Sequence, residues 1–260
     1  EAGVFHFMTH AFFKALLFMC AGVIIEGLAD EHDIFRMGGL RRELPAVFWT
    51  FTIGASTLAA LPFITSGFYS KDLIIASSLG SIHGNVWLYA GALVGAFLTG
   101  LYSFRLVWVV FFGERHTEVT RKPRWRQTFP LWVLSVFSLV AGFVWMPYWL
   151  GGFHPLATFL DTALPHVEWS ESLGQFAESA GAGFITMSVV LVGVGLAYLL
   201  WMPWRDATYA FSASPAMRPL VAFWLGGWGF DWFYERVFVR PVKWFAHWAR
   251  HDLVDYVVGG

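Results

Sequence analysis

Charged residues are scarce in this chain, and their scarcity excludes several classes of protein. Among its 260 residues only 13% are Asp, Glu, Lys or Arg, whereas a soluble domain carries roughly 25%. The formal net charge is −1, so no overall field attracts a nucleic acid. The one cysteine, Cys20, lies in an apolar run, which excludes a disulfide framework and a thiolate metal site. Glycine-rich phosphate-binding loops and the common hydrolase motifs are also missing.

Apolar residues, by contrast, occur in runs long enough to cross a lipid bilayer. They make up 57% of the chain. A spanning helix needs about 20 mostly apolar residues. Candidate spans are 4–28, 45–79, 85–112, 129–150 and 182–203. We therefore predict an all-α, multi-pass integral membrane protein.

The second candidate span is too long for one straight helix. At about 1.5 Å per residue, 45–79 would extend about 52 Å, and it contains Pro62, Ser66 and Gly67. Proline removes a backbone donor and clashes with the preceding turn. We predict two half-helices, 45–61 and 68–79, around a break near Pro62–Gly67. Broken backbone at membrane depth is typical of a transport path, because protein or water must satisfy it.

Lysine and arginine residues gather on one set of loops. If each candidate span crosses once, loops 29–44, 113–128 and 204–227 share a side and hold ten of the 17 cations. Loops 80–84 and 151–181 hold none. The positive-inside rule then predicts that the basic loops are cytoplasmic and that the acidic loop 151–181 is periplasmic.

Aromatic and charged residues alternate at short intervals over the stretch 228–258. This stretch is too polar to span a membrane and too aromatic to remain in water. We predict an amphipathic helix lying along the membrane surface, kinked or divided at Pro241. A surface helix of a further soluble domain is the alternative.

Three cations remain inside the predicted spans: Lys14, Lys71 and Arg105. An ionisable group there is costly and marks a functional site by default. His6, His10 and Lys14 follow one another at intervals of four residues, so a helix places them on one face as a titratable ladder. The two histidines have no evident third ligand for a metal.

Lys71 follows the predicted break and should lie at a depth similar to that of Lys14. Half-helices and broken backbone commonly form ion sites in transporters. Asp72 points about 100° away from Lys71, so it either pairs with another subunit or caps its half-helix. Arg105 stays protonated; it either tunes a neighbouring group or extends to the membrane interface.

The segments that carry these residues resemble a known family. FHFMTHAFFKALLFMCAGVII, then DIFRMGGLRRELP and LPFITSGFYSKDLII, are similar to subunit L of bacterial NADH:quinone oxidoreductase, the respiratory complex I, and to its mitochondrial subunit 5 equivalent. The likeness continues through LYSFRLVWVVFFG and WGFDWFYERVFVRPV, and it is strongest over 4–112. It implies an antiporter-like helix bundle with helices broken in mid-membrane. Stretch 228–258 matches the start of the family's lateral helix.

The resemblance implies a proton-translocating subunit of the bacterial inner membrane, with no redox chemistry and no catalytic residue of its own. No cofactor or metal is expected in this chain; NADH, FMN, iron–sulfur clusters and quinone are expected in other subunits. Expected partners are lipid and other membrane subunits of complex I, especially the adjacent antiporter-like subunit and those under the lateral helix, with no nucleic acid. The family's proton path falls on His6, His10, Lys14 and Lys71, with Asp72 and Arg105 as supporting residues.

The family pattern also predicts that the chain is a C-terminal fragment, not catalytic alone. Residue 1 is Glu, and the family's first repeat and final anchoring helix have no counterpart. We divide the sequence into 1–112, the end of an antiporter-like repeat; 113–203, two further spans with an acidic periplasmic loop; and 204–260, a cytoplasmic loop with the start of the lateral helix.

Two other functions remain open at this point. The large subunit of an Mrp-type sodium/proton antiporter shares the histidine–lysine helix. A structural role is the other possibility, in which the tail clamps neighbouring subunits of the membrane arm together. Replacing Lys14 and Lys71 in the intact complex separates a proton path from a clamp.

Overall fold

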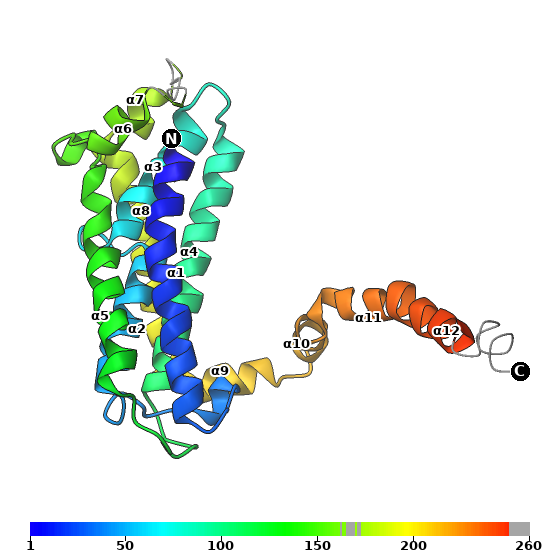
Figure 1. Ribbon diagram of the computed structural model, residues 1–260. Coiled ribbons are helices and arrows are strands. Elements are labelled where there is room, and N and C mark those ends of the chain that lie inside the picture. Colours follow the sequence, from blue (N-terminus) through cyan, green and yellow to red (C-terminus); the bar gives the residue numbers. More distant parts are fainter. Residues whose placement is uncertain (162, 165–169, 171–172, 250–260) are drawn as a thin grey trace, which may run out of the picture. The chain divides into compact units, whose positions relative to one another are not determined.

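The computed structural model describes residues 1–161, 163–164, 170 and 173–249. They form two units: a helical bundle, Glu1–Pro203, and a second unit that begins at Trp204. Figure 1 shows the elements of each unit. No strand occurs in the described part of the chain, and the prediction of an all-α protein is confirmed.

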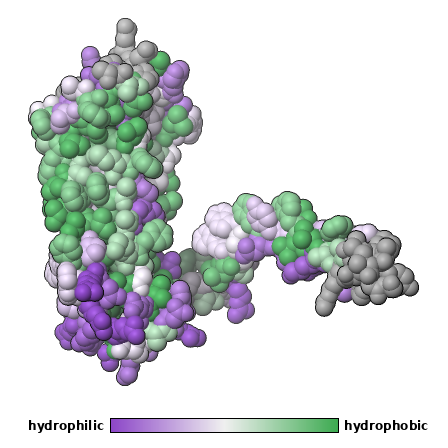
Figure 2. Space-filling model, in the orientation of Figure 1, coloured by the Kyte–Doolittle hydropathy of each residue, from purple (hydrophilic) through white to green (hydrophobic). Residues whose placement is uncertain are grey.

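Four helices of the bundle are long and apolar enough to cross a membrane: α1 (Ala2–Gly27), α4 (Val86–Phe111), α8 (Ala180–Trp201) and α5 (Trp125–Val140) with the short helix η2 (Ala141–Val144) that continues it. Large apolar side chains stay exposed on them, for example Phe7 and Trp87. Figure 2 shows hydrophobic residues around the middle of the bundle, with hydrophilic ones gathered where α1 ends and α5 begins. Such a surface suits lipid, and the chain is a multi-pass membrane protein.

The predicted break is confirmed, and it lies slightly earlier than expected. Helix α2 (Pro45–Ala59) ends in a left-handed residue, Ala60, with φ 65°, and α3 (Ser66–Gly80) begins six residues later. The prediction had extended the first half-helix to 61 and started the second at 68. Pro62 explains the early end, since proline disfavours helical backbone in the residue before it.

The fourth span differs from the predicted range 129–150. Its helix begins at Trp125, where the Gln127 side chain accepts the backbone N–H of Arg124, 2.9 Å away. Pro130 lies inside the helix, so proline does not start it. The helix then tightens into η2 and stops at Val144, before Pro147, because proline cannot continue the backbone hydrogen bonding. Residues 145–150 lie beyond the span and include the short turn η3 (Tyr148–Leu150).

Helices α4 and α8 approach closely at two glycines. A Cβ added at Gly193 would meet the backbone oxygen of Phe97 at 2.5 Å, and one at Gly100 would meet the oxygen of Val190 at 3.1 Å. Small residues at helix contacts allow close backbone approach in membranes, where the lipid supplies no hydrophobic drive for association. Position 193 therefore sets the separation of these two helices.

Loops at the basic end of the bundle, where α1 ends, are fastened to it by polar contacts. The backbone N–H of Thr120 donates to the oxygen of Gly27 at 2.9 Å. Arg121 forms an ion pair with Glu26 at 2.8 Å, and Arg115 with Glu43 at 3.2 Å.

Short helices η1 (Ile34–Arg36), α6 (Pro155–Leu160) and α7 (Gly174–Ala177) complete the bundle.

Short helices make up the second unit: α9 (Arg205–Ser212), α10 (Arg218–Leu225), η4 (Gly227–Gly229), α11 (Phe230–Tyr234), the π-helical η5 (Glu235–Val239) and α12 (Arg240–Ala249). The expected helix at 228–258 is confirmed over 230–249, and its residues 250–258 lie outside the described part. Pro241 does not divide it. The π-helical η5 ends at Val239, two residues before Pro241, and α12 continues through the proline.

Amphipathic character is evident along α12. Trp244, Phe245 and Trp248 are exposed. Charged neighbours lie among them, and Arg240 and Lys243 reach the Glu235 carboxylate at 3.7 and 3.9 Å. A helix that exposes aromatic rings beside cations is typical of a membrane interface.

Candidate functional site

The predicted ladder forms on α1. The rings of His6 and His10 lie 5.7 Å apart between centroids, and His10 sits edge-on to Phe13 at 5.1 Å. His10 interacts electrostatically with both Lys14 and Lys71. The Lys14 ammonium lies 5.5 Å from the ring of Phe18. Three titratable groups thus follow one another along one helix face, as their spacing predicted.

Helix α3 connects to this ladder through a serine. Ser70 Oγ lies 3.0 Å from Nδ1 of His6, and Thr9 donates to the same Ser70 oxygen at 2.9 Å. Both hydroxyl residues are fully buried. The histidine ladder and the second half-helix are therefore joined by direct hydrogen bonds, one residue before Lys71.

Lys71 occupies the break between the two half-helices. Its ammonium donates to the backbone oxygen of Leu58, in the last turn of α2. The last carbonyls of a helix lack intrahelical partners and carry the negative end of its dipole. Lys71 thus satisfies an orphan acceptor that the break creates, and it also interacts electrostatically with His6.

Gly67 makes this approach of α3 to α2 feasible. A Cβ at Gly67 would lie 1.9 Å from the backbone oxygen of Thr57. Because this clash is with the backbone, the movement of a side chain could not relieve it. The first turn of α3 therefore touches the end of α2 backbone to backbone. The glycine in SGFYSKD serves close contact, whereas the sequence had assigned it to the break.

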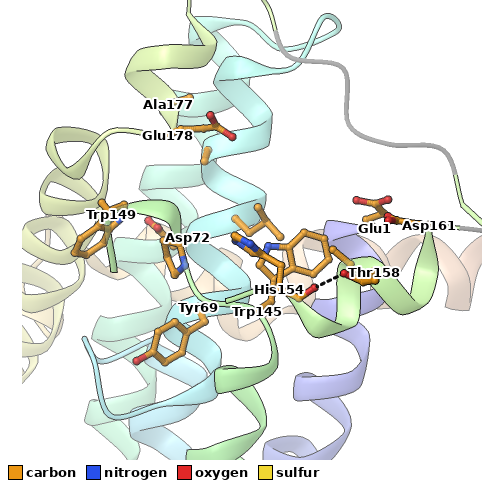
Figure 3. A pocket seen from close by; sticks show the side chains of 14 residues that line it. Glu1, Tyr69, Asp72, Trp145, Trp149, His154, Thr158, Asp161, Ala177 and Glu178 are labelled. Carbon is orange, nitrogen blue, oxygen red and sulfur yellow. Dashed lines mark hydrogen bonds between the residues drawn. The ribbon is translucent and has the colours of Figure 1, made fainter. Parts of the chain in front are cut away.

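Asp72 faces away from the ladder residues, into a cavity at the opposite end of the bundle from the basic loops. It is 7% exposed and hydrogen-bonds with Thr186 of α8. The cavity has a volume of about 500 Å³. Figure 3 shows Asp72 with Trp145, Trp149, His154 and Glu178 around it. Asp72 and Lys71 thus serve different sides of α3, in agreement with their 100° separation.

Residues of the acidic loop line this same cavity. His154 immediately precedes α6, Asp161 follows it, and Glu178 follows α7. Burial raises the pKa of the Glu178 carboxyl above its ordinary range, while the nearby His154 acts in the opposite direction. The acidic loop thus folds back onto α3 and brings these side chains to the cavity.

Arg105 is placed elsewhere by the structure. Its guanidinium lies 5.5 Å from the rings of both Phe35 and Trp201. It stands six residues before the end of α4, whereas Lys14 is in the middle of α1. The described contacts of Arg105 therefore connect the α1–α2 loop with α8, and none of them joins it to the ladder.

The sequence did not single out the hydroxyls and carbonyl that join these groups. Thr9 lies one turn after His6, and Ser70 immediately precedes Lys71. A small polar residue at such a position is common in any helix, so only the approach of α3 to α1 distinguishes it. The Leu58 carbonyl carries no sequence signal at all.

Comparisons with known proteins agree with the resemblance drawn from the motifs. Residues 1–99 match the family described as NADH:quinone oxidoreductase/Mrp antiporter, transmembrane. Subunit L of NADH-quinone oxidoreductase from Pseudomonas aeruginosa is 39% identical over 259 residues, which cover 100% of this chain and 40% of that protein. The chain is related to subunit L.

Other relatives support the same family. Escherichia coli subunit L is 37% identical over 257 residues, 97% of this chain and 38% of that protein. NADH-ubiquinone oxidoreductase chain 5 of Cryptococcus neoformans is 33% identical over 248 residues, 92% of this chain and 37% of that protein. The prediction of a subunit L and chain 5 relative is confirmed. The chain spans about 40% of the length of these relatives.

Proposed function

We propose that this chain supplies part of a proton path through the membrane arm of an NADH:quinone oxidoreductase. Protons move along His6, His10, Lys14 and Lys71, driven by quinone reduction in other subunits. The chain takes no part in redox chemistry and is not catalytic alone, since NADH, FMN, iron–sulfur clusters and quinone are held by other subunits. Its relatives are named as subunits of this oxidoreductase.

The single observation that carries the proposal is the position of Lys71 in the helix break. Its ammonium meets the carbonyl end of α2, while the neighbouring Ser70 contacts the first residue of the histidine ladder. An amine in a low-dielectric setting holds or releases its proton according to nearby charges. A change of charge on His10 or His6 therefore acts on Lys71 directly.

The surroundings of the chain belong to the same proposal. The bilayer is the bacterial inner membrane, and the partners are lipid, the adjacent antiporter-like subunit and the subunits under the lateral helix. Exposed aromatic rings on α12 and exposed apolar residues on the spans support contact with lipid or with apolar faces of neighbouring subunits.

Replacement of the two lysines tests the proton path in the intact complex. Lys71→Met and Lys14→Met keep a long apolar side chain and remove the proton-carrying amine. We expect each to lower NADH-driven proton uptake into inverted membrane vesicles about 100-fold or more, the range of a positioned acid–base group. A pH-sensitive dye measures the uptake, and the amount of assembled complex is quantified in parallel.

Lys122→Met is the matched control. Lys122 lies exposed in the basic loop and pairs with Glu43 at 3.6 Å, a surface ion pair of small energetic value. It should leave proton uptake unchanged. Normal uptake in Lys71→Met and Lys14→Met complexes that assemble fully would contradict the proton path and favour the structural clamp.

A sodium/proton antiporter is the second candidate, because the matching family description also names Mrp antiporters. The two functions differ in the transported ion. Uptake of radioactive sodium into the same vesicles, lost in Lys71→Met, would favour the antiporter. Dye-reported proton uptake without sodium movement favours the oxidoreductase subunit.

A further inference from the structure

The hydrogen bonds at Nδ1 of His6 can reverse while the Ser70 and Thr9 hydroxyls each keep an acceptor. Ser70 Oγ lies 3.0 Å from Nδ1 of His6 and 3.5 Å from the backbone oxygen of Gly67. Thr9 Oγ1 lies 2.9 Å from Ser70 Oγ and 3.1 Å from the backbone oxygen of His6. Each hydroxyl thus has two acceptors within reach, and one of the two is always a carbonyl of its own helix.

One arrangement suits a His6 ring whose Nδ1 carries no proton. Thr9 then donates to Ser70, and Ser70 donates to Nδ1. Because a hydroxyl oxygen both donates and accepts, Ser70 is fully paired. The ring is held from α3, and the two helices are connected through two successive hydrogen bonds.

The other arrangement suits a ring whose Nδ1 is protonated. Nδ1–H donates to Ser70, the Ser70 hydroxyl rotates toward the Gly67 carbonyl, and the Thr9 hydroxyl rotates toward the His6 carbonyl. Only hydroxyl protons rotate, and no heavy atom has to move. A buried donor or acceptor left unpaired would otherwise oppose one of the two states.

We infer that Ser70 and Thr9 are positioning residues that hold His6 in the same place whether Nδ1 is protonated or bare. This inference rests on the proposed proton path and deepens it. A ladder histidine must gain and lose a proton in each cycle. If its ring were held by a group that can only donate or only accept, Nδ1 would be hydrogen-bonded in only one of its two protonation states. The two hydroxyls can pair with Nδ1 in both protonation states, so they favour neither state and keep His6 within reach of its neighbours.

Residues of α1 and α3 surround the His6 ring. On α1 they are His10, 5.7 Å away between ring centroids, and the uncharged ring of Phe13 at 6.3 Å. On α3 the charged neighbour is Lys71, which interacts electrostatically with His6. The hydroxyls add no charge of their own, so they keep the ring in place without competing with these charges.

Paired substitutions at Thr9 test the inference in the intact complex. Thr9→Val keeps the side-chain shape and removes the hydroxyl, whereas Thr9→Ser keeps the hydroxyl and removes a methyl group. We expect Thr9→Val to lower NADH-driven proton uptake about fivefold, as for one lost neutral hydrogen bond. Thr9→Ser should restore uptake to within about twofold of the wild type. Ser70→Ala should lower uptake at least as much as Thr9→Val.

A buried threonine elsewhere provides the control. Thr50 of α2 is 0% exposed and donates to the Ala46 oxygen at 2.9 Å, so Thr50→Val makes the same change away from His6 and should leave uptake unchanged. Ser70→Ala decides the matter if Thr9→Val reduces the amount of assembled complex. Equal uptake in Thr9→Val and Thr9→Ser, with normal uptake in Ser70→Ala, would overturn the inference.

Failure of the inference and failure of the proposed function give different results. If Lys71→Met complexes translocate protons normally, the proton path itself is wrong. If Lys71→Met abolishes uptake while the Thr9 pair and Ser70→Ala behave like the wild type, the path stands and only the positioning role is wrong.

Discussion

Individual residues in this chain act through partner groups that cannot be recognised from the sequence. Lys71 was predicted as a proton carrier from its position after a proline, but its partner is the carbonyl of Leu58. Asp72, its neighbour, hydrogen-bonds with Thr186 and faces the cavity lined by Trp145 and Glu178. Adjacent residues on one helix thus serve two separate environments.

Glu178 provides a pH prediction at this scale. Burial raises its pKa, so it should keep its proton above the ordinary glutamate value of about 4.3. Because the folded-state pKa is raised, its contribution to stability is fully present at low pH and is lost as pH rises through the raised value. An infrared carbonyl band of a protonated carboxyl should therefore persist above pH 4.3 and disappear on further titration.

Glu178→Gln should remove that band, and this loss would assign the band to Glu178. The same substitution should reduce the loss of thermal stability that accompanies the titration, as followed by unfolding of the purified protein at several pH values. A band that disappears at the ordinary glutamate pKa would show that the loop does not bury Glu178.

At the scale of elements, one added methyl group is enough to change the separation of two packed helices. Gly193→Ala places a Cβ within 2.5 Å of the Phe97 backbone oxygen, which must separate α8 from α4. Overpacking of this kind costs about 1–3 kcal/mol. We expect a lower thermal unfolding temperature of the assembled complex and less of it in the membrane.

Gly195→Ala is the matched control on the same helix. A Cβ there meets nothing within 4 Å, and alanine favours helix over glycine by about 0.5–1 kcal/mol. The unfolding temperature should stay unchanged or rise. Equal destabilisation by both variants would contradict the close α4–α8 contact.

Several elements were predictable because their signals are local. Apolar length located the spans, and Pro62 located the break to within a few residues. The ends were less predictable: the fourth helix starts at Trp125 through a side-chain cap, and a π-helical turn precedes Pro241. Both outcomes depend on hydrogen-bond geometry that composition does not encode.

At the scale of the whole molecule, the distribution of charge predicts one orientation in the membrane. The basic loops should face the cytoplasm, and the loop between α3 and α4 should face the periplasm. Cys20, the one cysteine in the sequence, is buried, so it adds little background to thiol labelling. Glu118→Cys in a basic loop and His83→Cys in the α3–α4 loop therefore report the two sides.

A membrane-impermeant thiol reagent added to intact cells with permeabilised outer membranes should label His83→Cys and not Glu118→Cys. Inverted vesicles should give the opposite pattern. Labelling of both residues from one side would contradict the single crossing of the broken helix, on which the orientation depends.

The amino-acid sequence by itself determined the solvent, the helical class, the broken span and the ladder of His6, His10 and Lys14. These follow from hydrophobic length, proline chemistry and the helical repeat, which act between near neighbours in the chain. Only the tertiary structure decided which groups complete the site. The Ser70 and Thr9 hydroxyls, the Leu58 carbonyl and the loop residues around Asp72 come together because helices distant in sequence pack against one another, and a buried polar atom without a hydrogen-bond partner is costly.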